Sequence, residues 1–306
     1  MTTLAYKAAE AIARPFGYQR PFRLPHDEAF GQVAKINAQN AAPPRPLYWR
    51  FDVEERTIAG TSTYIFCSKN LEPQRRILFL HGGGGMLRAT PLHFVFVWHL
   101  VTQTRAEVWM PFYPLAPEHN VLDSLDACFS VYQQMLVRTE ADGLPLAIAG
   151  DSAGANLTLG TCRKAIDAGV RVPHALVALS PATGFEDPNV LANFKAQELA
   201  TNDPILCTEM MGLLLQTWCG NVPLDHPLAN PAFIDYTGFP PILMLYSTAE
   251  LFYPYTENIP AAMRAANAPL EELRMDGLMH DWMLVNFFPE GAAANVAVWN
   301  FIRNHT

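Results

Sequence analysis

The stretch LPLAIAGDSAGANLTLG, residues 144–160, decides the fold, because an apolar strand-like run passes through Gly150-Asp151-Ser152-Ala153-Gly154 into a helix-like run. A serine at so sharp a strand-to-helix turn has a strained backbone, so the residues two positions away on each side must be nearly free of side chains. The turn raises the serine Oγ above the sheet, beside the N-terminus of the next helix, where developing negative charge is favourable. We predict Ser152 as a nucleophile, supported by Asp151. The alternative is a glycine-bounded turn whose serine only caps the helix.

A second glycine-rich segment, HGGGG at 81–85, follows the apolar run RILFL. Four consecutive glycines cost backbone entropy, so the position needs bare backbone. An oxyanion hole has that need, because several N–H groups must reach one oxygen, and losing one such donor costs roughly 10²–10³ in rate. A flexible loop and a phosphate cradle are the alternatives. A phosphate loop would read GxxxxGK[ST], and no lysine follows here.

Apolar strand-like runs alternate with longer helical stretches, a pattern typical of a mostly parallel sheet. Several runs, such as RILFL, ALVAL and ILMLY, are apolar on both faces, which favours central strands covered by helices on each side. The predicted strands are 48–53, 62–67, 76–80, 107–111, 145–149, 175–179, 242–246 and 270–275. The predicted helices are 91–102, 121–138, 153–169, 259–266 and 291–304.

Two regions interrupt this alternation. Residues 1–45 are helical or irregular and rich in Pro and Ala, and residues 185–228 hold a helical run where a short crossover would suffice. Open α/β sheets bind ligands at the carboxyl ends of their strands, and both regions suit a cover over that edge. We predict a helical cap from 1–45 and 185–228 over a catalytic domain formed by 46–184 and 229–306.

Three segments together resemble the hormone-sensitive-lipase group of esterases. HGGG at 81–84 stands ahead of GDSAGAN at 150–156, and YPLAPEH at 113–119 is similar to the group's YRLAPEH, with Pro114 in place of arginine. HPLANPAFIDYTGFPPILMLYS, at 226–247, is similar to the run into the strand that carries the acid. The resemblance covers the chain from about residue 77 to its end. It implies the α/β-hydrolase fold: a mostly parallel, eight-stranded sheet with helices on both faces and a helical cap.

The resemblance also implies roles for individual residues. Gly83 and Gly84, with the N–H of Ala153, would form the oxyanion hole. His81 would brace that loop without transferring protons. Glu118, in the segment similar to YRLAPEH, would be a structural hydrogen-bonding residue.

The base and the acid follow from the chain order of this fold, which is Ser, then Asp or Glu, then His. His280 lies just beyond the last predicted strand and resembles the group's histidine loop, H-G-F or a variant, so we predict it as the base. The group usually has aspartate as the acid; here we predict Glu250, 30 residues before His280. Asp276 and Asp281 are sequence neighbours of the histidine, but adjacency does not bring a carboxylate to Nδ1. Glu257 is interpreted as a surface residue.

Apolar residues of the predicted insertion either line an acyl pocket or pack the cap onto the sheet. Methionine suits a pocket because its side chain adapts to varied shapes. Met86 stands where the group usually has an aromatic residue, which would change one wall of the cleft. We take Met86, Met211, Leu215 and Trp218 as the pocket candidates.

Composition excludes several classes of protein. Of 306 residues, 50% are hydrophobic and 16% charged, and the formal net charge of -8 disfavours nucleic acid and anionic membranes. No run approaches the roughly 18 apolar residues of a membrane span, and the first residues lack the apolar core of a secretion signal. The five cysteines are scattered without CxxC spacing, which predicts reduced thiols and a cytoplasmic location. The apolar composition leaves a homodimer open.

These observations predict a serine carboxylesterase that acts on small-molecule esters with short to medium acyl chains, through an acyl-enzyme. The chemistry needs no metal and no organic cofactor. An amidase or deacetylase, and an interfacial lipase, would use the same residues. A non-catalytic ligand-binding module would be expected to have lost Ser152 or His280, and both are present.

Overall fold

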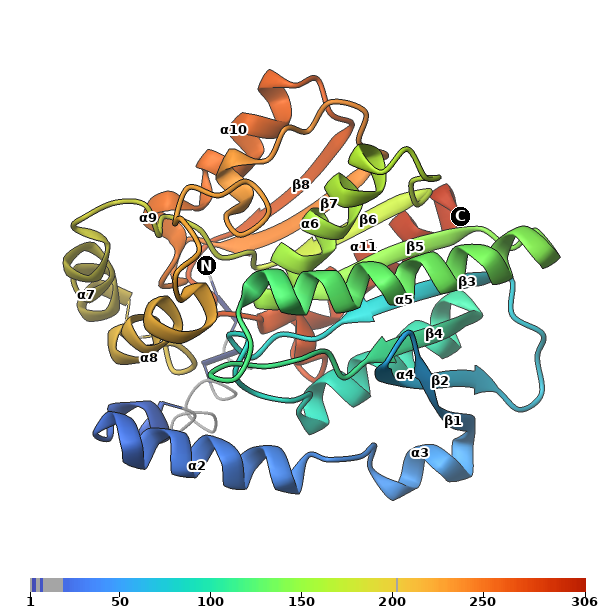
Figure 1. The fold of residues 1–306 in the computed structure, drawn as a ribbon, viewed down its shortest axis with the longest axis horizontal. Coiled ribbons are helices and arrows are strands. Elements are labelled where there is room, and N and C mark those ends of the chain that lie inside the picture. Colours follow the sequence, from blue (N-terminus) through green and yellow to red (C-terminus); the bar gives the residue numbers. More distant parts are fainter. Residues whose placement is uncertain (1, 4–5, 8–18, 202) are drawn as a thin grey trace.

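An eight-stranded sheet crosses the molecule in the order β1-β2-β4-β3-β5-β6-β7-β8 (Figure 1). The computed structural model describes residues 2–3, 6–7, 19–201 and 203–306. Strand β2 is antiparallel to both neighbours, and β4 to β8 run parallel with β3. The predicted fold class is therefore confirmed. The strands are β1 Phe51–Ile58, β2 Thr61–Ser68, β3 Arg75–Leu80, β4 Ala106–Pro111, β5 Leu146–Asp151, β6 Ala175–Leu179, β7 Ile242–Ser247 and β8 Leu270–Met275.

The central strands are buried on both faces because two hydrophobic cores enclose the sheet. Along β3, Leu78 and Leu80 enter one core, while Ile77 and Phe79 enter the other. This alternation follows from the two-residue period of a strand. The runs apolar on both faces are thus explained by helices on each side, as the sequence predicts.

The helices divide between these two cores. Residues of α5 (Val121–Asp142), α6 (Ala153–Asp167) and α10 (Asn258–Ala265) belong to the first core. Residues of α4 (Pro91–Thr104) and α11 (Pro289–His305) belong to the second. All five predicted helices are present, with ends shifted by a few residues.

The first strand begins later than predicted. Helix α3 (Arg45–Arg50) occupies the start of the predicted strand 48–53, and β1 begins only at Phe51. The helix forms because Pro44 stands at its N-cap and Pro46 lies in its first turn, where a missing N–H costs nothing.

Two segments far apart in the sequence lie together beyond the end of the sheet. The first holds η1 (Arg20–Arg23) and α2 (His26–Gln39). The second holds α7 (Val190–Thr201), α8 (Thr208–Leu214) and a π-helical turn, η2 (Leu215–Cys219). In Figure 1, α7 and α8 lie at the left, above one end of α2. These segments lie within the predicted cap regions, and part of 1–45 lies outside the described residues. The division into a cap and a catalytic domain stays a prediction.

Polar contacts join the two cap segments. Arg23 forms an ion pair of 2.7 Å with the buried Glu198 of α7, and Glu198 also accepts from the N–H and hydroxyl of Thr208. The Gln19 amide donates to the carbonyl oxygens of Asp203 and Leu206. Three short elements complete the described structure: η3 Pro231–Phe233, α9 Tyr253–Thr256 and η4 Trp282–Leu284.

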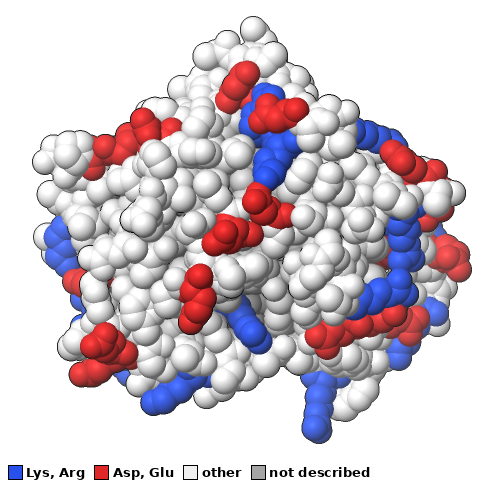
Figure 2. All heavy atoms as spheres, in the orientation of Figure 1, with Lys and Arg blue, Asp and Glu red and all other residues white. Residues whose placement is uncertain are grey.

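The surface agrees with the composition. On the face in Figure 2, Lys and Arg are interspersed with Asp and Glu and form no continuous basic patch. All five cysteines are unpaired, and four of them are buried. Within the described residues, no helix combines the length and apolar character needed to cross a membrane.

Candidate active site

The turn at Ser152 has the strained geometry that its glycines predict. Ser152 lies between β5 and α6 with φ of 52°, in the left-handed region that L-residues rarely adopt. A Cβ on Gly150 would stand 2.4 Å from the carbonyl oxygen of Gly154, and one on Gly154 would stand 1.9 Å from that of Leu80. The Ser152 N–H donates to Leu179 O at 2.7 Å, which anchors the turn to β6. Only glycine fits at 150 and 154, so the motif is explained by steric contact.

The glycine loop faces this serine. A Cβ on Gly82 would stand 2.2 Å from Asp151 Oδ2, and Gly83 and Gly84 have positive φ values of 109° and 62°. Gly83, Gly84 and Ser152 line one pocket. Ala153 is the first residue of α6, so its N–H has no partner within the helix and remains available to a ligand.

His280 and Glu250 form a buried pair. The imidazole Nδ1 lies 2.9 Å from Glu250 Oε2, and both residues are at most 2% exposed. Glu250 Oε1 accepts from the Ser180 hydroxyl at 2.9 Å and from the Ser247 N–H at 2.8 Å. Burial raises the pKa of Glu250, and the two donors oppose that rise. With the carboxylate as acceptor, Nδ1 holds the proton and Nε2 is left as the basic nitrogen.

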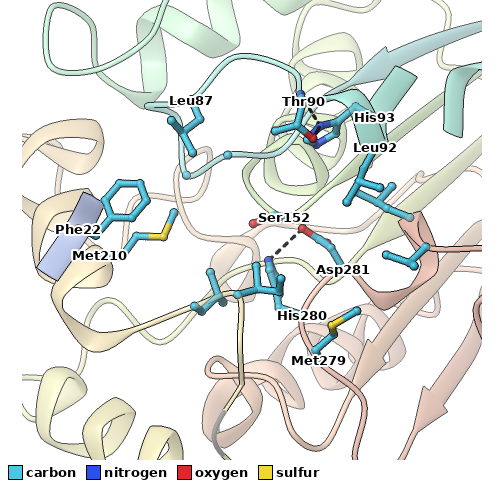
Figure 3. A pocket seen from close by; sticks show the side chains of 16 residues that line it. Phe22, Leu87, Thr90, Leu92, His93, Ser152, Met210, Met279, His280 and Asp281 are labelled. Atoms are coloured by element: carbon cyan, nitrogen blue, oxygen red, sulfur yellow. Dashed lines mark hydrogen bonds and ion pairs between the residues drawn. The ribbon is translucent and has the colours of Figure 1, made fainter. Parts of the chain in front are cut away.

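The other side of the imidazole faces the pocket. His280 Nε2 has no aligned hydrogen bond to any described residue, although Asp281 Oδ2 lies 3.2 Å away. That contact has the distance of an ion pair without the direction of a hydrogen bond. Ser152, His280 and Asp281 stand together in the middle of the pocket (Figure 3).

The pocket is small and mostly apolar, with a volume of about 100 Å³. Both cap segments contribute to it, Phe22 from η1 and Met210 from α8, as does the loop after His280 (Figure 3). Its apolar lining includes Leu87, Ile205, Leu206, Leu284 and Val285.

His81 is held as a neutral ring beneath the glycine loop. It is fully buried, and burial together with the nearby His93 lowers its pKa to about 4. Its Nδ1 lies 2.8 Å from Gly82 O, and its ring stacks on Tyr113 at 4.5 Å between centroids. The Tyr113 hydroxyl donates to His81 O. These contacts suit bracing and leave the ring outside the pocket lining.

His93 lines the pocket and was not among the residues predicted from the sequence. Its Nδ1 accepts from the Thr90 N–H at 2.9 Å, so Nε2 carries the proton and donates to Asp151 Oδ2 at 2.9 Å. Thr90 and His93 form the capping box of α4 and line the pocket. In the sequence, the capping pattern of Thr90 and His93, directly after the glycine loop, could have indicated this residue. The pair fixes Asp151 against the turn that carries Ser152.

The structure corrects the prediction of the pocket residues. Met86, Met211, Leu215 and Trp218 do not line the pocket. Met86, Met211 and Trp218 are buried in the first core, and Leu215 packs against it. The Trp218 Nε1 donates to Ser124 Oγ at 3.2 Å, and its ring fills the space beside Gly85. Met211, Leu215 and Trp218, from the second cap segment, therefore pack the cap onto the domain.

The structure also corrects the predicted hydrogen-bonding role of Glu118. Its side chain is exposed and makes no hydrogen bond to the described residues, because it lies in the surface turn ahead of α5. No group of three or more His, Cys, Asp or Glu side chains among the described residues could hold a metal ion.

Known proteins share both this sequence pattern and this fold. A family model described as the alpha/beta hydrolase fold matches residues 77–284, more than half of the chain. The chain belongs to the α/β-hydrolase family. The hydrolase is 26% identical to an esterase of Acinetobacter venetianus over 227 residues, which are 74% of this chain and 73% of that one. It is 27% identical to an acetyl-hydrolase of Streptomyces hygroscopicus over 234 residues, 76% of each.

The resemblance to hormone-sensitive lipase is confirmed. The hydrolase is 28% identical to the human enzyme of that name over 165 residues, 53% of this chain and 15% of that one. Among solved structures, an esterase from the bacterial hormone-sensitive lipase family matches with a TM-score of 0.82 and 21% identity, covering 100% of this chain and 99% of the other. An esterase/lipase from an uncultured bacterium matches with a TM-score of 0.83 and 23% identity, covering 99% of both. At these identities the structural likeness establishes the fold.

Proposed function

We propose that this hydrolase is a serine carboxylesterase, with Ser152 as nucleophile, His280 as general base and Glu250 as the acid. The observation that carries the proposal is the 2.9 Å contact between His280 Nδ1 and Glu250 Oε2, behind an Nε2 that opens onto the pocket of Ser152. A carboxylate that fixes the tautomer of an imidazole beside a strained serine is the arrangement of acyl-transfer enzymes. The names of the similar esterase and acetyl-hydrolase support ester hydrolysis.

The reaction then proceeds in two steps. As Ser152 Oγ attacks the ester carbonyl carbon, its proton passes to His280 Nε2, and Glu250 stabilises the imidazolium. The tetrahedral intermediate collapses, the bond to the alcohol oxygen breaks, and Nε2 returns the proton to the leaving alcohol. Water, deprotonated by the same nitrogen, attacks the acyl-enzyme and releases the carboxylic acid and free Ser152.

The negative charge on the former carbonyl oxygen needs donors. The N–H groups of Gly83, Gly84 and Ala153 are the proposed oxyanion hole, since both glycines line the pocket and Ala153 begins a helix. The helix N-terminus adds a favourable partial charge. Asp151, held by His93, supports the turn and does not line the pocket.

The substrate proposal follows from the pocket. A small cavity lined by aliphatic side chains and Met210 favours short to medium acyl chains. Amide hydrolysis and interfacial lipase action use the same residues, so they are the competing outcomes of the test. A cytoplasmic location and a homodimer stay predictions.

A serine-directed organophosphate tests the nucleophile. Mass spectrometry should find one adduct, on Ser152, and none in Ser152→Ala. Rates on nitrophenyl esters from acetate to palmitate, beside a matched anilide, then test the class. We expect a maximum at short to medium chains and slow anilide cleavage. An adduct elsewhere would overturn the nucleophile, and faster anilide cleavage would overturn the ester preference. A rate jump above the solubility limit of a long-chain ester would favour a lipase.

A further inference from the structure

Asp281 places a carboxyl group in the pocket, next to the nitrogen that is proposed to carry the catalytic proton. Its Oδ2 lies 3.2 Å from His280 Nε2, and the residue lines the same pocket as Ser152 (Figure 3). The surrounding wall is otherwise mostly apolar, with Leu284 and Val285 following on the same loop. A carboxyl in such surroundings calls for a partner.

The described part of the chain does not supply that partner. Asp281 Oδ1 is shielded from solvent and makes no hydrogen bond, and Oδ2 has only the misaligned contact with His280. Burial raises the pKa of Asp281 well above its ordinary value, as expected of a carboxyl that lacks donors. The charged groups that affect it are His280, Asp151, Glu250 and Asp203, and only His280 lowers its pKa.

The contact with His280 is lost during the reaction. Nε2 must turn to the Ser152 hydroxyl and then to the leaving alcohol oxygen, and neither step leaves it free for Asp281. Neither oxygen of Asp281 then has a donor among the described residues. A buried acceptor without a partner costs free energy. A substrate that brings a hydrogen-bond donor to Asp281 should therefore have a higher kcat/KM than one that does not.

The geometry also says which part of the substrate carries the donor. Because Nε2 must lie within hydrogen-bond reach of the leaving oxygen, Asp281, beside Nε2, is on the alcohol side of the ester. A hydroxyl two carbons beyond the ester oxygen would reach past Nε2 to the carboxyl.

We propose that Asp281 is a specificity residue that selects esters whose alcohol portion carries a hydroxyl on the carbon next to the ester-bearing carbon, as in glycol and glycerol esters. The inference rests on the proposed esterase function. The carboxyl of Asp281 accepts a hydrogen bond from this hydroxyl. Its contact with His280 Nε2 then ends, and Nε2 is free to accept the proton of Ser152.

The backbone at Asp281 offers a clean substitution. Its φ of 53° is left-handed, so glycine is the residue that removes the carboxyl with least strain there. Asp281→Asn keeps the shape and one acceptor oxygen. Asp276→Asn is a matched control, because Asp276 is an exposed carboxylate shortly before His280 in the same chain segment.

The test compares kcat/KM for 2-hydroxyethyl butyrate and propyl butyrate, which have the same size and differ by a hydroxyl in place of a methyl group. We expect the wild type to favour the hydroxyethyl ester by about tenfold, the effect of giving a buried acceptor the donor that it otherwise lacks. The preference should vanish in Asp281→Gly, shrink in Asp281→Asn and persist in Asp276→Asn. Organophosphate labelling of Ser152 shows that each variant retains a folded site.

An equal preference in the wild type and in a labelled Asp281→Gly variant would overturn the role of Asp281 and leave the esterase function standing. Failure of the wild type to hydrolyse either ester would overturn the proposed function itself, and this inference with it.

Discussion

Replacing Glu250 by glutamine should move the ring proton of His280 from Nδ1 to Nε2 without disturbing the packing around the imidazole. Glu250 Oε1 accepts from two donors, the Ser247 N–H and the Ser180 hydroxyl. The amide oxygen of glutamine must take that place, because the backbone N–H cannot turn away. The amide NH₂ then occupies the position of Oε2 and donates to Nδ1. The proton of the neutral ring moves to Nε2, which can no longer accept a proton from Ser152.

The magnitude follows from this tautomer. An amide in place of the triad carboxylate lowers kcat by about 10⁴-fold where the geometry is kept, which corresponds to about 5 kcal/mol of transition-state stabilisation. The free energy of unfolding should change little, since every partner of the carboxylate keeps a hydrogen bond. Glu250→Ala, in contrast, should change the free energy of unfolding. It leaves the Ser247 N–H buried without an acceptor, so the free energy of unfolding falls by about 1–3 kcal/mol.

The assay is steady-state hydrolysis of p-nitrophenyl butyrate, with urea denaturation of the same samples. Imidazole nitrogen shifts measured by NMR would report the tautomer directly. Glu257→Gln is the control, because Glu257 pairs with Arg274 at the surface and should leave kcat unchanged. A loss of less than about tenfold in Glu250→Gln would refute the tautomer argument.

Three further predictions concern packing and pH. Gly154→Ala should fail to yield folded protein in expression trials, because its Cβ would stand 1.9 Å from Leu80 O, and normal yield would contradict the steric account. Trp218→Ala should lower the free energy of unfolding by about 3–5 kcal/mol, measured in urea, while the folded fraction keeps its KM, because the ring packs the cap outside the pocket. Burial raises the pKa of Asp203 from 3.8 to about 6, so the folded state holds its proton more tightly than the unfolded state. The stability this proton gives is complete below about pH 4 and is lost as pH rises through 6. The free energy of unfolding of the wild type, relative to Asp203→Asn, should therefore fall by about 3 kcal/mol between pH 3.5 and 7. A difference that does not depend on pH would contradict the raised pKa of Asp203 in the folded state.

Local sterics and periodicity were readable from the sequence. The glycines at 150 and 154 are required by backbone contacts within one turn, so the motif itself predicts the strained serine. The parallel sheet follows from strands that are apolar on both faces, which only helices on each side can cover. The start of β1 was predicted wrongly because a proline-initiated helix precedes it.

The partners of the site were decided by tertiary structure. Three contacts join residues that lie more than 50 positions apart: the Ser180 hydroxyl with Glu250, His93 with Asp151, and Trp218 with Ser124. Sequence order placed Glu250 and His280 as candidates, but adjacency said nothing of where the carboxyl of Asp281 points. Its position beside Nε2 depends on the left-handed backbone of Asp281 and on the packing of its loop at the pocket wall. Periodicity reports which face of an element is apolar, and only the packing of distant segments decides whether that face meets the core or the substrate.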